Sequence, residues 1–195
     1  MSGYRIVLAS GSPRRKEILG KLQTDFEVMV SNVEEITDET EPVEIVKALS
    51  ELKAEDIFGK IHDETEKTVV IGSDTVVAYK GEIMGKPKNR EDAFRMIRQF
   101  AGDKHTVYSG VTIIIKNDEV KKITFGVGTD VEVDSMTDEE IYSYIDTGEP
   151  FDKAGAYAVQ GLFAPYIKGI HGDYYNIVGF PIHDVYRVLK DEGVV

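Results

Sequence analysis

The chain contains no cysteine among its 195 residues. Disulfides, thiolate catalysis and cysteine-based zinc sites are therefore excluded, and the composition is compatible with a reducing compartment. The chain also lacks any apolar run near the roughly 20 residues that span a membrane. Its first residues show neither the basic segment nor the long apolar segment of a secretory signal. We therefore expect a soluble, cytoplasmic protein with no membrane partner.

Positive charge is scarce as well. Lys and Arg number 23 against 35 Asp and Glu, which gives a net charge of -12. Broad affinity for phosphate backbones needs a positive surface, so nucleic acid is not expected as the main partner. Two local basic clusters stand out, Arg14-Arg15-Lys16 and Lys86-Pro87-Lys88 with Arg90. Basic clusters in an acidic chain suit a pocket for a small polyanion.

Several catalytic motifs are missing. The histidines show no metal-ligand spacing, and no Gly-x-Ser-x-Gly elbow occurs. The segment Gly81–Pro87 is no P-loop, because it is one residue short and Pro87 replaces the Ser or Thr that would hold magnesium. It still holds Lys86 between a glycine and a proline, where its charge could meet a phosphate. An aspartyl-phosphate route is disfavoured, because Val76 stands where a second acid would follow Asp74.

Strand-like and helix-like patterns alternate along the chain. We expect strands at residues 4–8, 26–30, 68–79, 83–84, 106–115 and 120–133. Helices are expected at residues 13–22, 42–58, about 93–100, 137–147 and 181–189. The segment 151–179 shows no clear period. The pattern predicts a mixed α/β fold in one domain over residues 1–195, or at most two small lobes that share a core.

The hexapeptide Ser10–Arg15 follows the first expected strand directly. Ser12 is a favoured N-cap residue and Pro13 suits a first helical turn, so a helix should begin here with its positive end at the loop. Its backbone N–H groups and the guanidinium groups of Arg14 and Arg15 could then bind a phosphate. A capped helix with two solvated arginines explains the hexapeptide alone equally well.

Three polar residues elsewhere could serve chemistry on a phosphate. Asp74 interrupts an apolar strand, and such an acid needs a cation, a metal or a proton to handle, unless it caps a turn. Glu35, in the loop after the second strand, could reach a divalent cation together with Asp74, although Glu34-Glu35 taken alone is typical of a solvated pair. Gln160 could read a nucleobase edge or be the surface glutamine of a tightly packed turn.

Seven ordered motifs resemble those of the Maf family of nucleoside triphosphate pyrophosphatases, and the resemblance covers nearly the whole chain. The motifs are Ala9–Arg15, Val33-Glu34-Glu35, Lys53-Ala54, Gly72–Thr75, Gly85-Lys86-Pro87, Asp152–Tyr157 and Gln160-Gly161. The resemblance implies an α/β fold with two lobes around a central nucleotide cleft. It also implies hydrolysis between the α- and β-phosphates. Arg14, Thr75 and Gln160 are similar to the dTTP/UTP branch, which implies pyrimidine substrates.

The family's functional residues are carried over by position. The resemblance implies that Asp74 accepts the proton of the attacking water, that Glu35 assists, and that both hold Mg²⁺ or Mn²⁺. The residues implied at the triphosphate are Ser10, Arg14, Arg15, Lys53 and Lys86, with Thr75 and Gln160 also implied at the substrate. A homodimer stays open. The alternatives are a regulatory nucleotide-binding protein in cell division and septum formation, and a pyrophosphatase for purine or modified nucleotides.

Overall fold

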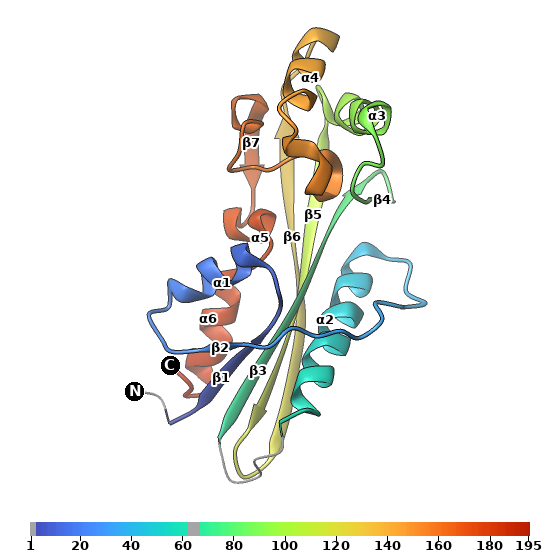
Figure 1. Cartoon of the computed structure of the whole chain (residues 1–195). Coiled ribbons are helices and arrows are strands. Elements are labelled where there is room, and N and C mark those ends of the chain that lie inside the picture. Colours follow the sequence, from blue (N-terminus) through green and yellow to red (C-terminus); the bar gives the residue numbers. More distant parts are fainter. Residues whose placement is uncertain (1–2, 62–66) are drawn as a thin grey trace. The chain divides into compact units, whose positions relative to one another are not determined.

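A computed structural model describes residues 3–61 and 67–195 of the chain (Figure 1). The strands are β1 (Arg5–Ala9), β2 (Glu27–Val28), β3 (Thr68–Tyr79), β4 (Glu82–Met84), β5 (Lys104–Lys116), β6 (Val120–Val133) and β7 (Ile167–His171). The α-helices are α1 (Pro13–Gly20), α2 (Pro42–Phe58), α3 (Arg90–Phe100), α4 (Asp138–Ile145), α5 (Tyr174–Val178) and α6 (Ile182–Asp191). Short 3-10 helices are η1 (Glu149–Asp152), η2 (Ala154–Ala156) and η3 (Ala164–Tyr166). Within the described ranges, no helix is long and apolar enough to cross a membrane.

The seven strands form one mixed sheet in the order β2-β1-β3-β5-β6-β7, and β4 pairs with β3. Strand β1 is parallel to both β2 and β3, whereas β4 is antiparallel to β3 and β7 is antiparallel to β6. Together with the flanking helices, this confirms the predicted mixed α/β class.

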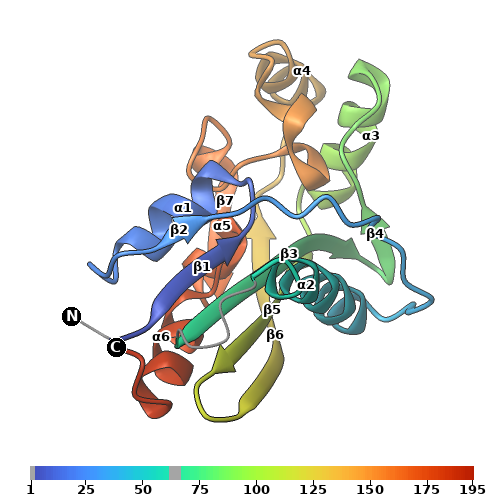
Figure 2. The ribbon, with the colours of Figure 1, turned by 60° about the horizontal axis from the view of Figure 1, so that its bottom comes forward.

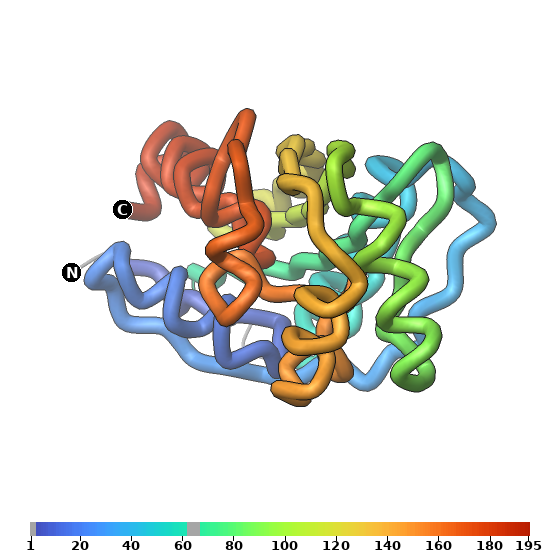
Figure 3. Tube along the Cα trace, turned by 90° about the horizontal axis from the view of Figure 1, so that it is seen from above, coloured from blue at the N-terminus to red at the C-terminus, as the bar shows by residue number. Residues whose placement is uncertain are grey.

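The chain divides into two compact units. Unit 1 contains Met1–Thr75, Ser109–Val127 and Gly179–Val195, and unit 2 contains Val76–Tyr108 and Gly128–Val178. Figure 3 follows these separate stretches along the chain by colour. The chain therefore crosses between the units several times, directly after Thr75 in the middle of β3 among other places.

Two glycines bring helix α2 against the sheet of unit 1 (Figure 2). An added Cβ at Gly72 of β3 would lie 2.3 Å from the carbonyl oxygen of Ser50, and one at Gly110 of β5 would lie 2.1 Å from that of Val46. No real Cβ tolerates such distances, so only glycine permits this close approach of the helix backbone. Side chains that leave α2 toward β3 are consequently held very near that strand.

Unit 2 has its own apolar core. The helical spacing that predicted a helix near residues 93–100 is confirmed by α3, whose Ala93, Met96, Ile97 and Phe100 are buried in that core. The predicted capping box is also present at the start of α4: the Thr137 hydroxyl accepts from the Glu140 N–H, and the Glu140 carboxylate accepts from the Thr137 N–H.

Several expectations differ from the structure. The first helix ends at Gly20 rather than Leu22, and α4 ends at Ile145 rather than Thr147. Strand β2 has two residues instead of the expected five, and both are exposed at the edge of the sheet. Sequence patterns did not find β7 or α5 in the segment 151–179, because both are short and largely half-buried, and short half-buried segments show little hydrophobic period.

Candidate active site

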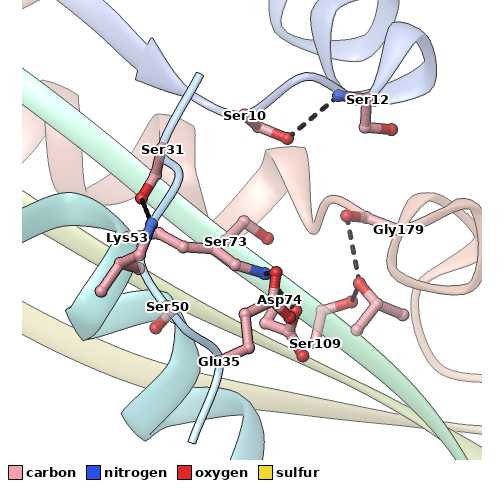
Figure 4. A network of polar contacts seen from close by, with 12 residues as sticks. Ser10, Ser12, Ser31, Glu35, Ser50, Lys53, Ser73, Asp74, Ser109 and Gly179 are labelled. Atoms are coloured by element: carbon pink, nitrogen blue, oxygen red, sulfur yellow. Dashed lines mark hydrogen bonds and ion pairs between the residues drawn. The ribbon is translucent and has the colours of Figure 1, made fainter. Parts of the chain in front are cut away.

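Asp74 carries the carboxylate that the site is built around. It lies in the middle of β3, and its side chain is only 11% exposed. Lys53 on α2 reaches it with its ammonium group, whose Nζ lies 2.6 Å from Asp74 Oδ1, and the Lys53 side chain is 12% exposed (Figure 4). The close packing of α2 on β3 at Gly72, two residues before Asp74, explains how the two groups meet. The charged partner offsets the cost of burying the carboxylate.

Glu35 joins the same ammonium from a loop. Its Oε1 lies 3.0 Å from Lys53 Nζ, and its side chain is 54% exposed. The loop that carries Glu35 is also tied to α2 farther along, because the Ser31 hydroxyl donates to Asp56 Oδ2 at 2.7 Å. Lys53 and Asp56 are three residues apart on α2 and lie on the same face of the helix. This face therefore binds the loop at both Glu35 and Ser31.

The guanidinium group of Arg15 donates hydrogen bonds to several oxygen atoms of the protein. Its Nε donates to the carbonyl of Gly179 at 2.9 Å, its Nη1 to the carbonyl of Ser73 at 2.7 Å and to Ser10 Oγ at 3.3 Å, and its Nη2 to Thr75 Oγ1 at 3.2 Å. Burial lowers the pKa of the Arg15 guanidinium, and the nearby carboxylates partly offset this effect. Arg15 was expected to contact the substrate. Most of its N–H donors are already used in hydrogen bonds to the protein.

The loop before α1 is held by its own serine. Helix α1 begins at Pro13 as predicted, but the Ser12 side chain makes no capping hydrogen bond. Instead the Ser12 N–H donates to Ser10 Oγ at 3.2 Å. The nearby Arg14 of α1 is half-buried, and its side chain forms no hydrogen bond or ion pair with the described part of the protein. The donors of the Arg14 guanidinium are thus available to an anion.

Thr75 is surrounded by residues that the sequence did not suggest. Its Oγ1 lies 2.8 Å from Ser109 Oγ of β5 and 3.3 Å from the carbonyl oxygen of Gly179, to which it donates. Side chains alternate along a strand, so Thr75 and Asp74 point to opposite faces of β3. No sequence signal connects Ser109 or Gly179 to this site, because each belongs to a distant segment with no motif of its own.

The two remaining predicted residues belong to unit 2, and both are exposed. Lys86 lies just after β4, and Gln160 lies in the turn that follows Val159. Residue Glu149 holds the Gln160 turn, because its carboxylate accepts from the Leu162 N–H at 3.0 Å. In unit 1 the predicted residues thus form two contact groups, one of Lys53, Asp74 and Glu35 and the other of Ser10, Arg15 and Thr75.

The carboxylates of Asp74 and Glu35 are the chemically suitable oxygen donors for a divalent cation here. Within the described part of the chain, no group of three or more acidic or histidine side chains could hold a metal. The two carboxylates nevertheless converge on one cationic atom, Lys53 Nζ, at 2.6 and 3.0 Å. They therefore fit a cation that takes its remaining ligands from water or substrate oxygens.

Comparisons with known proteins agree with this architecture. The family model described as "Maf-like protein" matches residues 5–192. A protein of Lachnoclostridium phytofermentans named "dTTP/UTP pyrophosphatase" is 54% identical over 193 residues, which are 98% of this chain and 96% of that relative. A relative of the same name from Thermoanaerobacter sp. is 46% identical over 188 residues, which are 96% of both chains. The chain belongs to the Maf family.

A solved structure supports the fold. The Staphylococcus aureus Ham1 protein matches with a TM-score of 0.50 and 16% sequence identity, over 96% of this chain and 99% of that chain. At this identity the likeness concerns the fold, and it agrees with the mixed sheet and flanking helices described above.

Proposed function

We propose that this protein hydrolyses dTTP and UTP between the α- and β-phosphates, releasing the nucleoside monophosphate and pyrophosphate. The structural observation that supports the proposal is the buried Asp74 carboxylate, which contacts the same ammonium group as Glu35. The support for the substrates is that relatives at 54% and 46% identity over nearly their whole length are named dTTP/UTP pyrophosphatases.

Asp74 is proposed as the proton acceptor. A water oxygen attacks the α-phosphorus and forms a new P–O bond, while the bond from that phosphorus to the α,β-bridging oxygen breaks. The proton of the water passes to Asp74, and pyrophosphate leaves with the bonding electron pair. A carboxylate in this role contributes typically about 10²- to 10⁴-fold to the rate.

The triphosphate would be bound by the side chains that have donors to give. In unit 1 these are Ser10, Arg14 and Lys53, while Arg15 holds the surroundings of Ser10 and Thr75 in place through its hydrogen bonds. Thr75, Lys86 and Gln160 are proposed to act at the substrate on the basis of the family resemblance. A pyrimidine substrate follows from the same resemblance and from the names of the relatives.

We further propose that Asp74 and Glu35 hold Mg²⁺ or Mn²⁺. When bound, such an ion neutralises phosphate oxygens and lowers the pKa of the attacking water. The cytoplasmic location and a homodimer remain predictions. A cytoplasmic location would place the protein with its nucleotide substrates.

A product analysis tests the proposed function. The purified protein is incubated with each canonical and several modified nucleoside triphosphates, with Mg²⁺, with Mn²⁺ and with chelator. We expect metal-dependent release of pyrophosphate, fastest from dTTP and UTP. Release of orthophosphate would overturn the assigned bond, and turnover led by purine nucleotides would overturn the assigned base. Binding of nucleotides without turnover would favour a regulatory protein of cell division.

A further inference from the structure

Lys53 occupies the place where two carboxylates meet. Its Nζ lies 2.6 Å from Asp74 Oδ1 and 3.0 Å from Glu35 Oε1, both within the range of charge-assisted hydrogen bonds. The Lys53 and Asp74 side chains are only 12% and 11% exposed, so water screens their contact weakly, whereas the Glu35 side chain is 54% exposed. The two carboxylates thus already share one cation, the ammonium group of Lys53.

Among the described residues, Lys53 supplies the cation that directly contacts the oxygen atoms of these two acids. Two carboxylates face one ammonium group, which gives the three side chains a net charge of about -1. The Arg15 guanidinium also acts electrostatically on both carboxylates, but it contacts neither of them, because its hydrogen bonds go to the neutral acceptors Ser73, Thr75, Gly179 and Ser10. A cation of higher charge is therefore attracted to the same oxygen atoms.

A divalent cation that uses these oxygen atoms must compete with the ammonium group. A metal ion about 3 Å away repels a lysine ammonium, because Coulomb repulsion grows as the distance falls and as water is excluded, and the Asp74 side chain is only 11% exposed. The lysine side chain has a flexible four-carbon stem, so its head group can move away without a change in the backbone. Once displaced, it needs a new counter-charge.

We propose that Lys53 competes with the divalent metal for Asp74 and Glu35, and that a bound triphosphate takes up the displaced ammonium group. Metal and nucleotide therefore bind this site cooperatively. The inference rests on the proposed function for the identity of the nucleotide. It assigns to Lys53 two alternative partners: the acidic pair in the free protein, and the phosphates in the loaded protein.

Cooperativity follows from linkage. The nucleotide draws Lys53 away from the carboxylates and so raises the affinity for metal, and by thermodynamic necessity the metal raises the affinity for nucleotide by the same factor. A site of this kind binds metal weakly before the substrate arrives. Couplings between sites are typically about 5- to 150-fold, and we expect a value in this range.

Mn²⁺ binding without nucleotide tests the competition, and it requires no turnover. Free Mn²⁺ is counted by electron paramagnetic resonance during titration of the wild type and of Lys53→Met. We expect the variant to bind Mn²⁺ about tenfold or more tightly, because its carboxylates have lost their resident cation. Lys47→Met is the matched control: Lys47 lies on the same helix, its ammonium pairs with Glu44, and its loss should leave Mn²⁺ affinity unchanged.

Further variants and one ligand complete the test. Lys53→Arg keeps the charge and should not bind Mn²⁺ more tightly than the wild type, and Lys53→Gln repeats the expected gain if Lys53→Met does not fold. The affinity of a dUTP analogue with a methylene bridge between its α- and β-phosphates is then measured with and without saturating Mn²⁺. Mn²⁺ should tighten its binding to the wild type, and this coupling should shrink in Lys53→Gln.

The outcomes separate this inference from the proposed function. Equal Mn²⁺ affinities of the wild type, Lys53→Met and Lys53→Gln would overturn the competition even if dTTP is hydrolysed. Tighter Mn²⁺ binding by the variants would support the competition even in a protein without turnover. Absence of Mn²⁺ binding in every variant, with or without the analogue, would overturn the inference together with the proposed metal site.

Discussion

The guanidinium group of Arg15 and the carbonyl oxygen of Gly179 are joined by a hydrogen bond of 2.9 Å across 164 residues of sequence. The same guanidinium group donates to the carbonyl of Ser73 in β3. Arg15 therefore ties helix α1 to the centre of the sheet and to the segment that enters α6. The neighbouring Arg14 makes no such bond among the described residues, so two adjacent arginines are expected to have different roles.

Replacing the two arginines separately should distinguish these roles. Arg15→Lys cannot reproduce the fork of donors and should lower the free energy of unfolding by about 2–3 kcal/mol. Arg14→Lys should leave that free energy within about 0.5 kcal/mol of the wild type and raise the KM for dTTP. Urea unfolding and initial rates measure both effects. Equal urea midpoints for Arg15→Lys and the wild type would contradict the structural role.

The contact between α2 and β3 at Gly72 should tolerate no side chain. A methyl group there would lie 2.3 Å from the backbone oxygen of Ser50, so Gly72→Ala must push the helix away. We expect a loss of about 1–3 kcal/mol in the free energy of unfolding, together with a loss of activity, because Lys53 moves with the helix. Gly20→Ala is the control, since a Cβ there meets nothing within 4 Å. Wild-type stability of Gly72→Ala would contradict the packing.

The turn that carries Gln160 depends on Glu149. The Glu149 carboxylate accepts from the Tyr144 hydroxyl at 2.9 Å and from the Leu162 N–H at 3.0 Å. A Cβ at Gly161 would lie 2.3 Å from this carboxylate. Glu149→Ala should loosen the turn and raise the KM for dTTP about tenfold, the equivalent of one lost charge-assisted hydrogen bond, with a smaller change in kcat.

Steady-state kinetics of Glu149→Ala and of two further variants test whether the rise in KM comes from the loss of the Glu149 hydrogen bond. Glu149→Gln should restore much of the KM, because its amide oxygen accepts the same N–H group. The exposed Glu139 of α4 provides the control Glu139→Gln, which should be neutral. An unchanged KM in Glu149→Ala would show that the turn does not need Glu149.

Unit 2 contains a buried histidine that should make stability depend on pH. His105 is 3% exposed, stacks on Phe100 with ring centroids 4.1 Å apart, and lies 2.7 Å from the Tyr157 hydroxyl. Burial lowers the pKa of His105 from 6.5 to about 4. Between these values the unfolded chain binds a proton that the folded chain does not, so the free energy of unfolding falls as the pH decreases, by about 3 kcal/mol over the range.

Urea unfolding between pH 7 and pH 4 measures this effect. The double variant His105→Phe/Tyr157→Phe removes both polar partners and should lose this part of the pH dependence. His183→Gln, at an exposed position, should keep it. If the double variant shows the pH dependence of the wild type, other groups are responsible.

Replacing Asp74 by asparagine should remove the proton acceptor with little change in shape. We expect kcat for dTTP to fall by about 10²- to 10⁴-fold, while the protein stays folded by circular dichroism. Asp191→Asn, at an exposed position in α6, should keep the wild-type rate. Wild-type turnover by Asp74→Asn would show that another group accepts the proton.

Strong local patterns made part of the fold predictable. The boundaries expected for α2 and β3 agree with the structure, because α2 begins at a proline and β3 is a long apolar run. Strand β7 was not predicted, since its five residues take their place through pairing with β6 and have no pattern of their own.

The site was predictable only where a residue is unusual in its own segment. Asp74 could be singled out because a carboxylate in an apolar strand needs a partner. That its partner is Lys53 could not be read from the sequence, because the close packing at Gly72 brings the two side chains together. Ser109 and Gly179 were missed for the same reason: only the folded chain places them beside Thr75.

Hydrolysis of dTTP in ¹⁸O-labelled water tests the central claim most directly. Attack of water on the α-phosphorus predicts that the wild type, with Mg²⁺ or Mn²⁺, places one ¹⁸O atom in the monophosphate and none in the pyrophosphate, as mass spectrometry of the separated products would show. Label in pyrophosphate or in orthophosphate would contradict the assigned reaction.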